Sequence, residues 1–136
     1  MAEDLGWLDT NLFVHARTRD EHSAACRKLL ARLEVGDAQG RIDPVVVHEL
    51  TYALTQKFPV SKQEAADYAK MVLSWDSIEA AGGKEPLIAA LGTWAAENVA
   101  FADALLAARA LQDGTCVCSV NTRDSERAGP GAKRPR

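Results

Sequence analysis

The sequence predicts an α/β fold with three layers, α/β/α, around a central parallel sheet of about four to five strands. Short apolar runs alternate with longer helical patterns along the 136 residues. The segments between these runs are long enough to be helical crossovers, which join strands that run in parallel. A chain of this length suits one domain with a sizeable core.

The first half of the chain alternates clearly between the two kinds of segment. Residues 5–9 predict a short strand and residues 12–16 a short apolar helix. Residues 20–34 predict an amphipathic helix, because Ala25, Leu29 and Leu33 share one stripe and Gly36 follows as a stop signal. Ile42 belongs to a brief second strand, and Pro44 suits the first turn of the helix that continues over residues 45–56.

The second half repeats the pattern. Ser61 followed by Glu64 is a capping-box pattern, and it predicts a helix that runs to about residue 75. A third strand is expected over residues 77–81, helices over 84–98 and 102–112, and a last strand over 115–120. Residues 1–127 therefore form one predicted domain, and the Gly-, Pro- and Arg-rich residues 128–136 are expected to be a disordered tail.

Composition and charge exclude several functions. Residues 1–126 carry 12 basic and 19 acidic residues, which argues against a nonspecific nucleic-acid coat but suits a nuclease with an acidic metal site. No apolar run is long enough to span a membrane, and the acidic start does not resemble a signal peptide, so we expect a cytoplasmic protein. The three scattered cysteines are expected to be free thiols, and they offer no zinc site.

Four acidic positions are candidates for chemistry. Asp9 is expected at the carboxyl end of the first strand, where α/β folds bind ligands, although Asp also favours a helix N-cap. Glu49 borders an apolar helical stripe and needs a partner, either a metal ion or a buried Arg or Lys. Asp103 lies in a helix apolar enough to be buried all round, where it also complements the helix dipole. Asp124 follows the last strand together with Asn121, in a loop that begins at Ser119.

These positions are expected to converge. The strand ends and helix starts of a parallel sheet meet at one edge, and several carboxylates cannot stay ionised together there without a cation. Oxygen ligands favour Mg²⁺ or Mn²⁺. Two other classes of α/β protein are excluded. A receiver domain needs an acidic pair after its first strand and a Lys after its last strand, but Asp9 stands alone and residues 115–126 contain no Lys. A dehalogenase-type phosphatase needs an Asp at the position where this chain has Asn11.

The chain resembles the PIN-domain toxins of the VapC type. Four segments carry the resemblance: Leu8-Asp-Thr-Asn-Leu-Phe13, Val47-His-Glu-Leu-Thr-Tyr-Ala-Leu54, Phe101-Ala-Asp-Ala-Leu-Leu-Ala-Ala108 and Asn121-Thr-Arg-Asp124. The resemblance implies that Asp9, Glu49 and Asp103 are the main catalytic and metal-binding acids. Asn121 stands where many members have Asp, so Asp124 is the expected fourth acid, with Asn11, Asn121 and Ser119 as supporting polar groups.

The resemblance also implies an activity and partners. It implies a Mg²⁺- or Mn²⁺-dependent endoribonuclease, the toxin half of a toxin–antitoxin pair, which forms a homodimer and is blocked by a protein antitoxin. The alternative is a catalytically weak or inactive PIN-like module that binds RNA or a protein partner, which the neutral Asn121 would favour.

Overall fold

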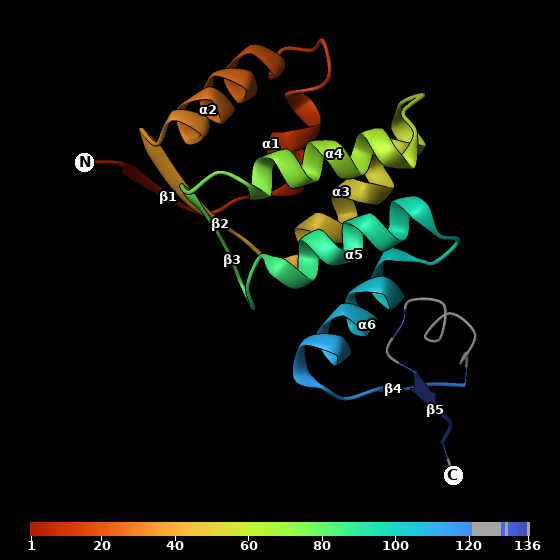
Figure 1. Ribbon diagram of the computed structural model, residues 1–136. Helices are drawn as coiled ribbons and strands as arrows, with labels where there is room; N and C mark the ends of the chain where they lie inside the picture. Colours follow the sequence, from red (N-terminus) through yellow and green to blue (C-terminus); the bar gives the residue numbers. More distant parts are fainter. Residues whose placement is uncertain (121–128, 130, 136) are drawn as a thin grey trace. The chain divides into compact units, whose positions relative to one another are not determined.

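Strands and helices alternate along the chain in the computed structural model, which describes residues 1–120, 129 and 131–135 (Figure 1). The α/β class expected from the sequence is confirmed. Five strands lie within the described residues, three in one parallel sheet and two in another. The chain divides into two compact units, Met1–Lys84 and Glu85–Arg136, and the larger sheet belongs to the first.

Three parallel strands form the sheet of the first unit, in the order β1-β2-β3. They are β1 (Glu3–Trp7), β2 (Ala38–Ile42) and β3 (Ile78–Ala80). Successive side chains point to opposite faces of a strand. On β2 this buries Ala38 and Ile42 and leaves Gln39 exposed, and β3 shows the same alternation. One face of the sheet therefore packs into the core.

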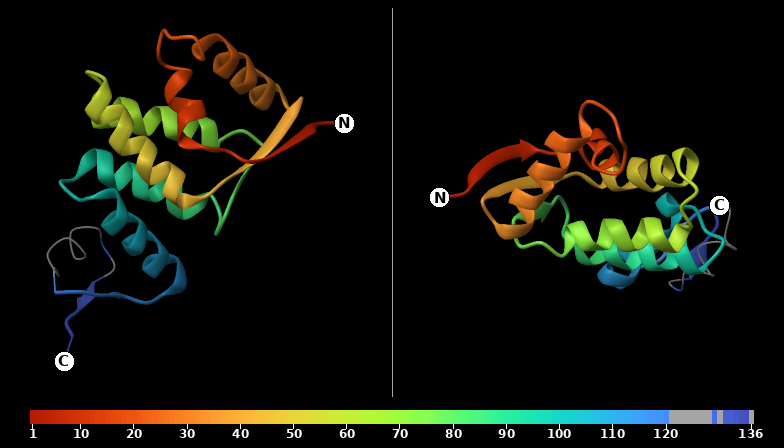
Figure 2. Two further views of the ribbon diagram at one scale, coloured as in Figure 1. Left: turned by 180° about the vertical axis from the view of Figure 1, so that it is seen from behind. Right: turned by 90° about the horizontal axis from the view of Figure 1, so that it is seen from above.

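Two helices follow each of the first two strands. These are α1 (Thr10–His15) and α2 (Ser23–Val35) after β1, and α3 (Pro44–Lys57) and α4 (Lys62–Leu73) after β2. Crossovers between parallel strands are almost always right-handed, so strands added in one direction place both helix pairs on the same face. In agreement, α2 lies against β2 and α4 against β3, while α3 contacts both α1 and α4 (Figure 2).

Local signals in the sequence set the helix ends. Asp43 caps α3 by accepting a hydrogen bond from the backbone N–H two residues later at 2.9 Å, and Pro44 occupies the first turn. Ser61 caps α4 by accepting from the Glu64 N–H at 3.1 Å, as the capping pattern predicts. Gly36 ends α2 in the left-handed conformation, with φ 87°, which favours glycine.

The core of the first unit anchors α1 against α4. Its largest fully buried side chains are those of Phe13, Leu33, Leu54, Val72, Leu73 and Ile78. Inside this core the Tyr68 hydroxyl donates a hydrogen bond to the Phe13 carbonyl oxygen at 2.9 Å. Both packing and a buried hydrogen bond therefore fix α1, the helix that begins directly after Asp9.

The second unit contains two helices packed on each other and a pair of very short strands. The helices are α5 (Glu85–Ala96) and α6 (Phe101–Asp113), and the strands are β4 (Val117–Cys118) and β5 (Ala132–Lys133), which pair in parallel. The expectation that α6 is buried all round is wrong. It buries Phe101, Ala104 and Ala107 but exposes Asp103 and Leu106, because a helix packed on one face keeps the other in solvent.

Two expected strands have different bounds in the structure. β1 ends at Trp7 rather than at Asp9, because Asp9 caps α1. The last strand, expected over residues 115–120, is limited to Val117–Cys118, the two residues that pair with β5. β5 itself lies within the residues expected to form a tail. None of the helices in the described part of the chain is long and apolar enough to cross a membrane.

Candidate functional site

Asp9 stands at the start of α1 and caps that helix. Its backbone is extended, with φ −90° and ψ 153°, and its Oδ1 accepts a hydrogen bond from the Thr10 N–H at 2.8 Å. Aspartate favours this position because its carboxylate satisfies an amide group that the helix leaves unpaired. Asp9 is also exposed, so capping the helix leaves the carboxylate accessible to a ligand.

Glu49 lies on α3 and is held by the same threonine. The Thr10 hydroxyl, on a residue only 6% exposed, donates a hydrogen bond to Glu49 Oε2 at 2.8 Å. Thr10 and Glu49 are 39 residues apart in the sequence. Glu49 is exposed rather than buried, so it does not require a buried Arg or Lys. Thr10 thus binds Asp9 through its amide and Glu49 through its hydroxyl, and it brings the two acids together.

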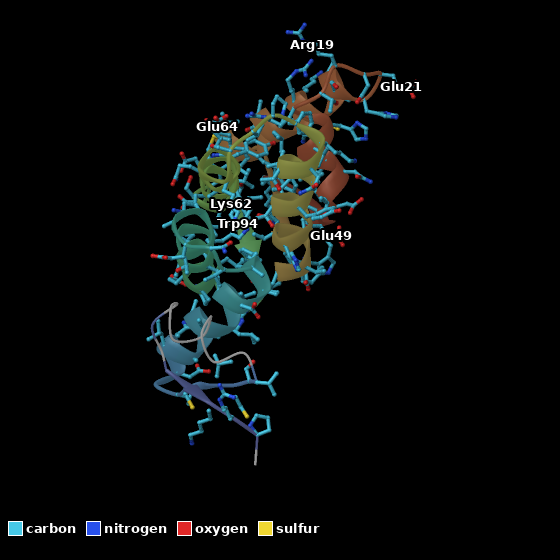
Figure 3. The ribbon with its side chains drawn as sticks, turned by 90° about the vertical axis from the view of Figure 1, so that its right-hand side faces the viewer. Arg19, Glu21, Glu49, Lys62, Glu64 and Trp94 are labelled. Carbon is cyan, nitrogen blue, oxygen red and sulfur yellow. The ribbon has the colours of Figure 1, made fainter. Side chains whose placement is uncertain are left out.

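Asp9 and Glu49 line one open pocket of about 440 Å³, which lies wholly within the first unit. Its other lining residues come from α1 and α3 and are Thr10, Asn11, His48, Tyr52, Ala53, Gln56 and Lys57. Figure 3 shows Glu49 on the outer side of α3. The volume falls in the range of about 300–1,000 Å³ that is typical of ligand pockets.

Helical spacing explains why α3 supplies so much of this pocket. Residues four apart lie one above the other on a helix face. Glu49, Ala53 and Lys57 form one such row along α3. His48, Tyr52 and Gln56 form the neighbouring row. The small Ala53 side chain leaves a hollow between longer neighbours, and the pocket follows it.

Sequence reasoning missed part of this pocket. His48, Tyr52, Gln56 and Lys57 were not expected at the site. His48 is exposed, but it lines the pocket. The sequence spacing could have identified these residues. They follow His48 or Glu49 at intervals of four residues, and this spacing places them on the same side of α3. Asn11, expected as a supporting polar group, does line the pocket.

The remaining expected site residues lie outside the first unit. Asp103 is exposed in the first turn of α6, and the Ser119 N–H donates to the Lys133 carbonyl oxygen at 2.7 Å beside the β4-β5 pair. Asn121 and Asp124 fall outside the described residues. The expected convergence of the four acids therefore stays a prediction. Within the described ranges, no three His, Cys, Asp or Glu side chains form a group that could hold a metal ion.

The two acids of the pocket nevertheless fit a hard divalent cation. Mg²⁺ in proteins is commonly bound by one or two carboxylates, several waters and the phosphates of a substrate. Asp9 and Glu49 supply two carboxylates from separate elements, both exposed and both lining the same pocket. No cysteine lines it, so its donors are oxygens apart from the imidazole of His48 and the amine and amide nitrogens of Lys57, Gln56 and Asn11. The donor set suits Mg²⁺ or Mn²⁺ better than a soft ion.

Comparison with known proteins points to one family. A family model described as PIN domain matches residues 7–128, which is most of the chain. The matched range includes Asp9, Glu49 and Asp103, and it also includes the positions of Asn121 and Asp124. A search of curated proteins found no match.

Proposed function

The chain belongs to the PIN-domain family, whose members are typically metal-dependent nucleases, and we propose that it is a Mg²⁺- or Mn²⁺-dependent endoribonuclease. The reaction is hydrolysis of RNA phosphodiester bonds. The observation that carries the proposal is the pocket in which Asp9 and Glu49 lie together, joined through Thr10. Two exposed carboxylates in one open pocket offer a place where a divalent ion and a phosphate can meet.

The proposed ion is held by carboxylates from several parts of the chain. Asp9 and Glu49 contribute from the first unit, and Asp103 and Asp124 complete the set. The assignments of Asp103 and Asp124 rest on their positions in the sequence and on the family pattern. The supporting polar groups are Asn11, Ser119 and Asn121. Carboxylates gathered in this way repel one another, and the bound cation offsets that repulsion.

The side chains of the pocket have separate roles in this proposal. A divalent ion, when bound, supplies the positive charge that orients a phosphodiester, activates water and offsets the charge on the leaving oxygen. Glu49 would accept the proton of the attacking water as a general base, and the hydrogen bond from the Thr10 hydroxyl, which fixes the direction of its carboxylate, supports this role. Asp9, which also lines the pocket, is held by the hydrogen bond that its carboxylate accepts from the Thr10 N–H.

The resemblance of four sequence segments to the VapC-type toxins also suggests a biological role and partners for this protein. It supports a role as the toxin of a toxin–antitoxin pair in the cytoplasm. It also supports a homodimer and a cognate protein antitoxin that closes the pocket. These partners rest on the resemblance alone.

The decisive experiment compares two aspartates that have the same structural role. Asp9 and Asp43 both cap helices, but only Asp9 lines the pocket. Asparagine is also a good N-cap, so Asp9→Asn and Asp43→Asn should both fold. In mixed RNA with millimolar Mg²⁺ or Mn²⁺, the cleavage rate of Asp9→Asn should be lower than that of the wild type by a factor of about 100 or more. The reason is that a lost metal ligand removes several kcal/mol of charge stabilisation. Asp43→Asn should cleave as the wild type does.

Measurements on Asp9→Asn and on the wild type distinguish a catalytic role of the pocket from RNA binding without cleavage. Removing one negative charge from the acidic pocket should leave the metal-free stability of Asp9→Asn unchanged or raise it. Normal RNA cleavage by Asp9→Asn would overturn the catalytic assignment. Absence of cleavage by the wild type together with metal-independent RNA binding would favour the inactive, RNA-binding module instead.

A further inference from the structure

Tyr52 is the most exposed Phe, Tyr or Trp residue in the described part of the chain. Its exposed fraction is 67%, and that of Trp7, the next of these residues, is 60%. A large ring left in solvent loses the free energy that burial would supply. Tyr52 lines the pocket, three residues after Glu49 and on the adjacent row of α3. The exposed ring is therefore positioned next to the acidic end of the pocket.

Lys57 provides the opposite charge at the other end of the same helix face. It lies in the row of Glu49 and Ala53, eight residues after Glu49, which corresponds to about 12 Å along the helix axis. The pocket thus runs from two carboxylates, past an aromatic ring, to an ammonium group. That sequence of groups matches a nucleic-acid strand, whose bases stack on aromatic rings and whose phosphates bind lysine.

We propose that Tyr52 is a stacking platform for an unpaired RNA base and that Lys57 binds a phosphate of the same strand, one or more nucleotides from the cleaved bond. The inference rests on the proposed ribonuclease function and adds a substrate subsite to it. An unpaired strand is required, because a base inside a duplex has both faces covered by its neighbours and cannot stack on a side chain. Ala53 between the two residues leaves the hollow in which the nucleotide lies.

Stacking and charge can be measured separately in the full chain. The probe is a short single-stranded RNA with 2-aminopurine at one position, a fluorescent base whose emission falls when it stacks. Asp9→Asn serves as the background in Mg²⁺, so that the probe stays intact during the measurement. The probe is made in several versions, with the fluorescent base moved one position at a time.

Substitution of the ring should remove the stacking signal. Tyr52→Ala should weaken RNA binding roughly 5- to 150-fold, which corresponds to the measured range for one base on one aromatic ring. It should also abolish the quenching at the position nearest the ring. Tyr52→Phe should retain both affinity and quenching, because the ring is kept. Trp7→Ala removes an exposed ring outside the pocket and should change neither quantity.

Substitution of the lysine should change the salt dependence instead. Each phosphate contact on a single strand contributes about 0.7 to the slope of log affinity against log salt. Lys57→Gln should therefore lower that slope by about 0.7 and leave the 2-aminopurine quenching in place. Lys28→Gln removes an exposed lysine of α2 and should leave the slope unchanged. Tyr52→Ala should lower affinity at every salt concentration without a change of slope.

The outcomes distinguish this inference from the proposed function. If the wild type fails to cleave RNA but Tyr52→Ala loses binding and quenching, the subsite stands and the nuclease assignment fails. If the wild type cleaves RNA and Tyr52→Ala binds with unchanged affinity and quenching, the stacking platform is wrong and the nuclease assignment stands. A last comparison tests the preference for an unpaired strand. If Tyr52→Ala and the Asp9→Asn background bound a fully duplex RNA with equal affinity, and each bound the duplex as tightly as the single strand, this preference would be overturned.

Discussion

The Thr10 hydroxyl donates a hydrogen bond to Glu49 Oε2 at 2.8 Å, while the Thr10 N–H donates to the Asp9 carboxylate. One buried residue therefore orients both acids of the pocket. A hydroxyl that fixes a ligand carboxylate sets the direction of its lone pairs, and such outer partners affect metal sites strongly. In the proposed site, Thr10 therefore has the role of a positioning residue, because it acts through Asp9 and Glu49.

Thr10→Val should test this positioning role. Valine keeps the shape of the side chain and the amide that binds Asp9, but it cannot donate to Glu49. We expect RNA cleavage to fall roughly 10- to 100-fold, as for other outer partners of metal ligands, with RNA affinity in the absence of metal unchanged. Thr10→Ser restores the hydroxyl and should recover most of the activity. Equal activity of Thr10→Val and Thr10→Ser would contradict the role.

The variant Gly40→Ala tests the packing of Leu8, the residue that precedes Asp9. A Cβ atom at Gly40 would lie 2.8 Å from the side chain of Leu8, which is 6% exposed and cannot move into solvent. Gly40→Ala should therefore reduce the free energy of unfolding by about 1–3 kcal/mol, the usual cost of overpacking. Because Leu8 precedes Asp9, cleavage should fall as well. Urea denaturation and RNA cleavage measure the two effects.

A double mutant identifies the cause of that loss. Leu8→Ala makes room for the added methyl group, so Leu8→Ala with Gly40→Ala should cost less stability than the sum of the two single variants. Additive costs would mean that the contact with Leu8 is not the source of the destabilisation.

Tyr68 should be the tyrosine that resists ionisation. Burial raises the pKa of Tyr68 to about 12, although the nearby Arg17 opposes this shift. The folded state thus holds the phenolic proton more tightly than the unfolded chain, and the stability from the neutral hydroxyl is lost as pH rises from about 10, the ordinary tyrosine value. Tyr68→Phe should remove the late phase of the ultraviolet titration. It should also destabilise the fold by about 1 kcal/mol, because the Phe13 carbonyl loses its donor.

The parts of the fold that follow from short-range signals could be predicted. Gly36, Pro44 and Ser61 each act on the residues next to them, so the ends of α2, α3 and α4 were predictable within a few residues. The parallel arrangement followed from the lengths of the helical crossovers. Strand ends were less predictable, because Asp9 can end a strand or cap a helix, and the structure uses it as a cap.

The pocket was predictable only at its two acids and at Asn11. The rule that ligands bind at the carboxyl ends of parallel strands identified Asp9, and the apolar surroundings identified Glu49. The hydrogen bond between Thr10 and Glu49 joins segments 39 residues apart, and no local pattern encodes it. The role proposed for Tyr52 depends on which side chains remain exposed after packing, and a single sequence does not reveal this.

Asp20 is expected to stabilise the loop between α1 and α2 in a pH-dependent way. Its carboxylate accepts hydrogen bonds from the Thr18 hydroxyl at 2.5 Å, from His15 Nδ1 at 2.9 Å and from the His22 N–H at 2.8 Å. The Thr18 hydroxyl, followed by the other two donors, lowers the pKa of Asp20 well below its ordinary value. The stabilisation is thus present above about pH 4 and is lost as pH falls toward the lower value in the folded state.

Asp20→Asn should remove this stabilisation while keeping a side chain of the same size. The variant should be less stable than the wild type near pH 5, and the difference between their urea midpoints should shrink as the pH falls toward about 2. Glu21 lies next in the chain, pairs with His22 at 3.4 Å and provides the matched control, Glu21→Gln. A difference between wild type and Asp20→Asn that stayed constant down to pH 2 would show that charge on Asp20 is not the cause.

Metal-linked stability provides a test of the acids that does not depend on cleavage. A ligand that binds only the folded state raises its stability by mass action, by about 2.7 kcal/mol at 100 times its dissociation constant. Millimolar Mn²⁺ should therefore raise the melting temperature of the wild type, and Asp9→Asn should reduce the increase. If Asp103 is a ligand as proposed, Asp103→Asn should reduce it similarly. Asp113→Asn, at the far end of the same helix, should not.

The fourth position can be resolved with the same assay. A neutral amide adds no charge to a metal site, so Asp124→Ala should reduce both the Mn²⁺-dependent increase in melting temperature and RNA cleavage far more than Asn121→Ala does. Extra Mn²⁺ should partly restore cleavage by Asp124→Ala, because a weakened site fills at higher concentration. If Asp124 only caps a helix, Asp124→Ala should instead lose about 1 kcal/mol of stability, with or without metal, and cleave RNA normally. Normal cleavage by Asp124→Ala would therefore remove Asp124 from the proposed metal site and leave Asp9, Glu49 and Asp103 as its carboxylates.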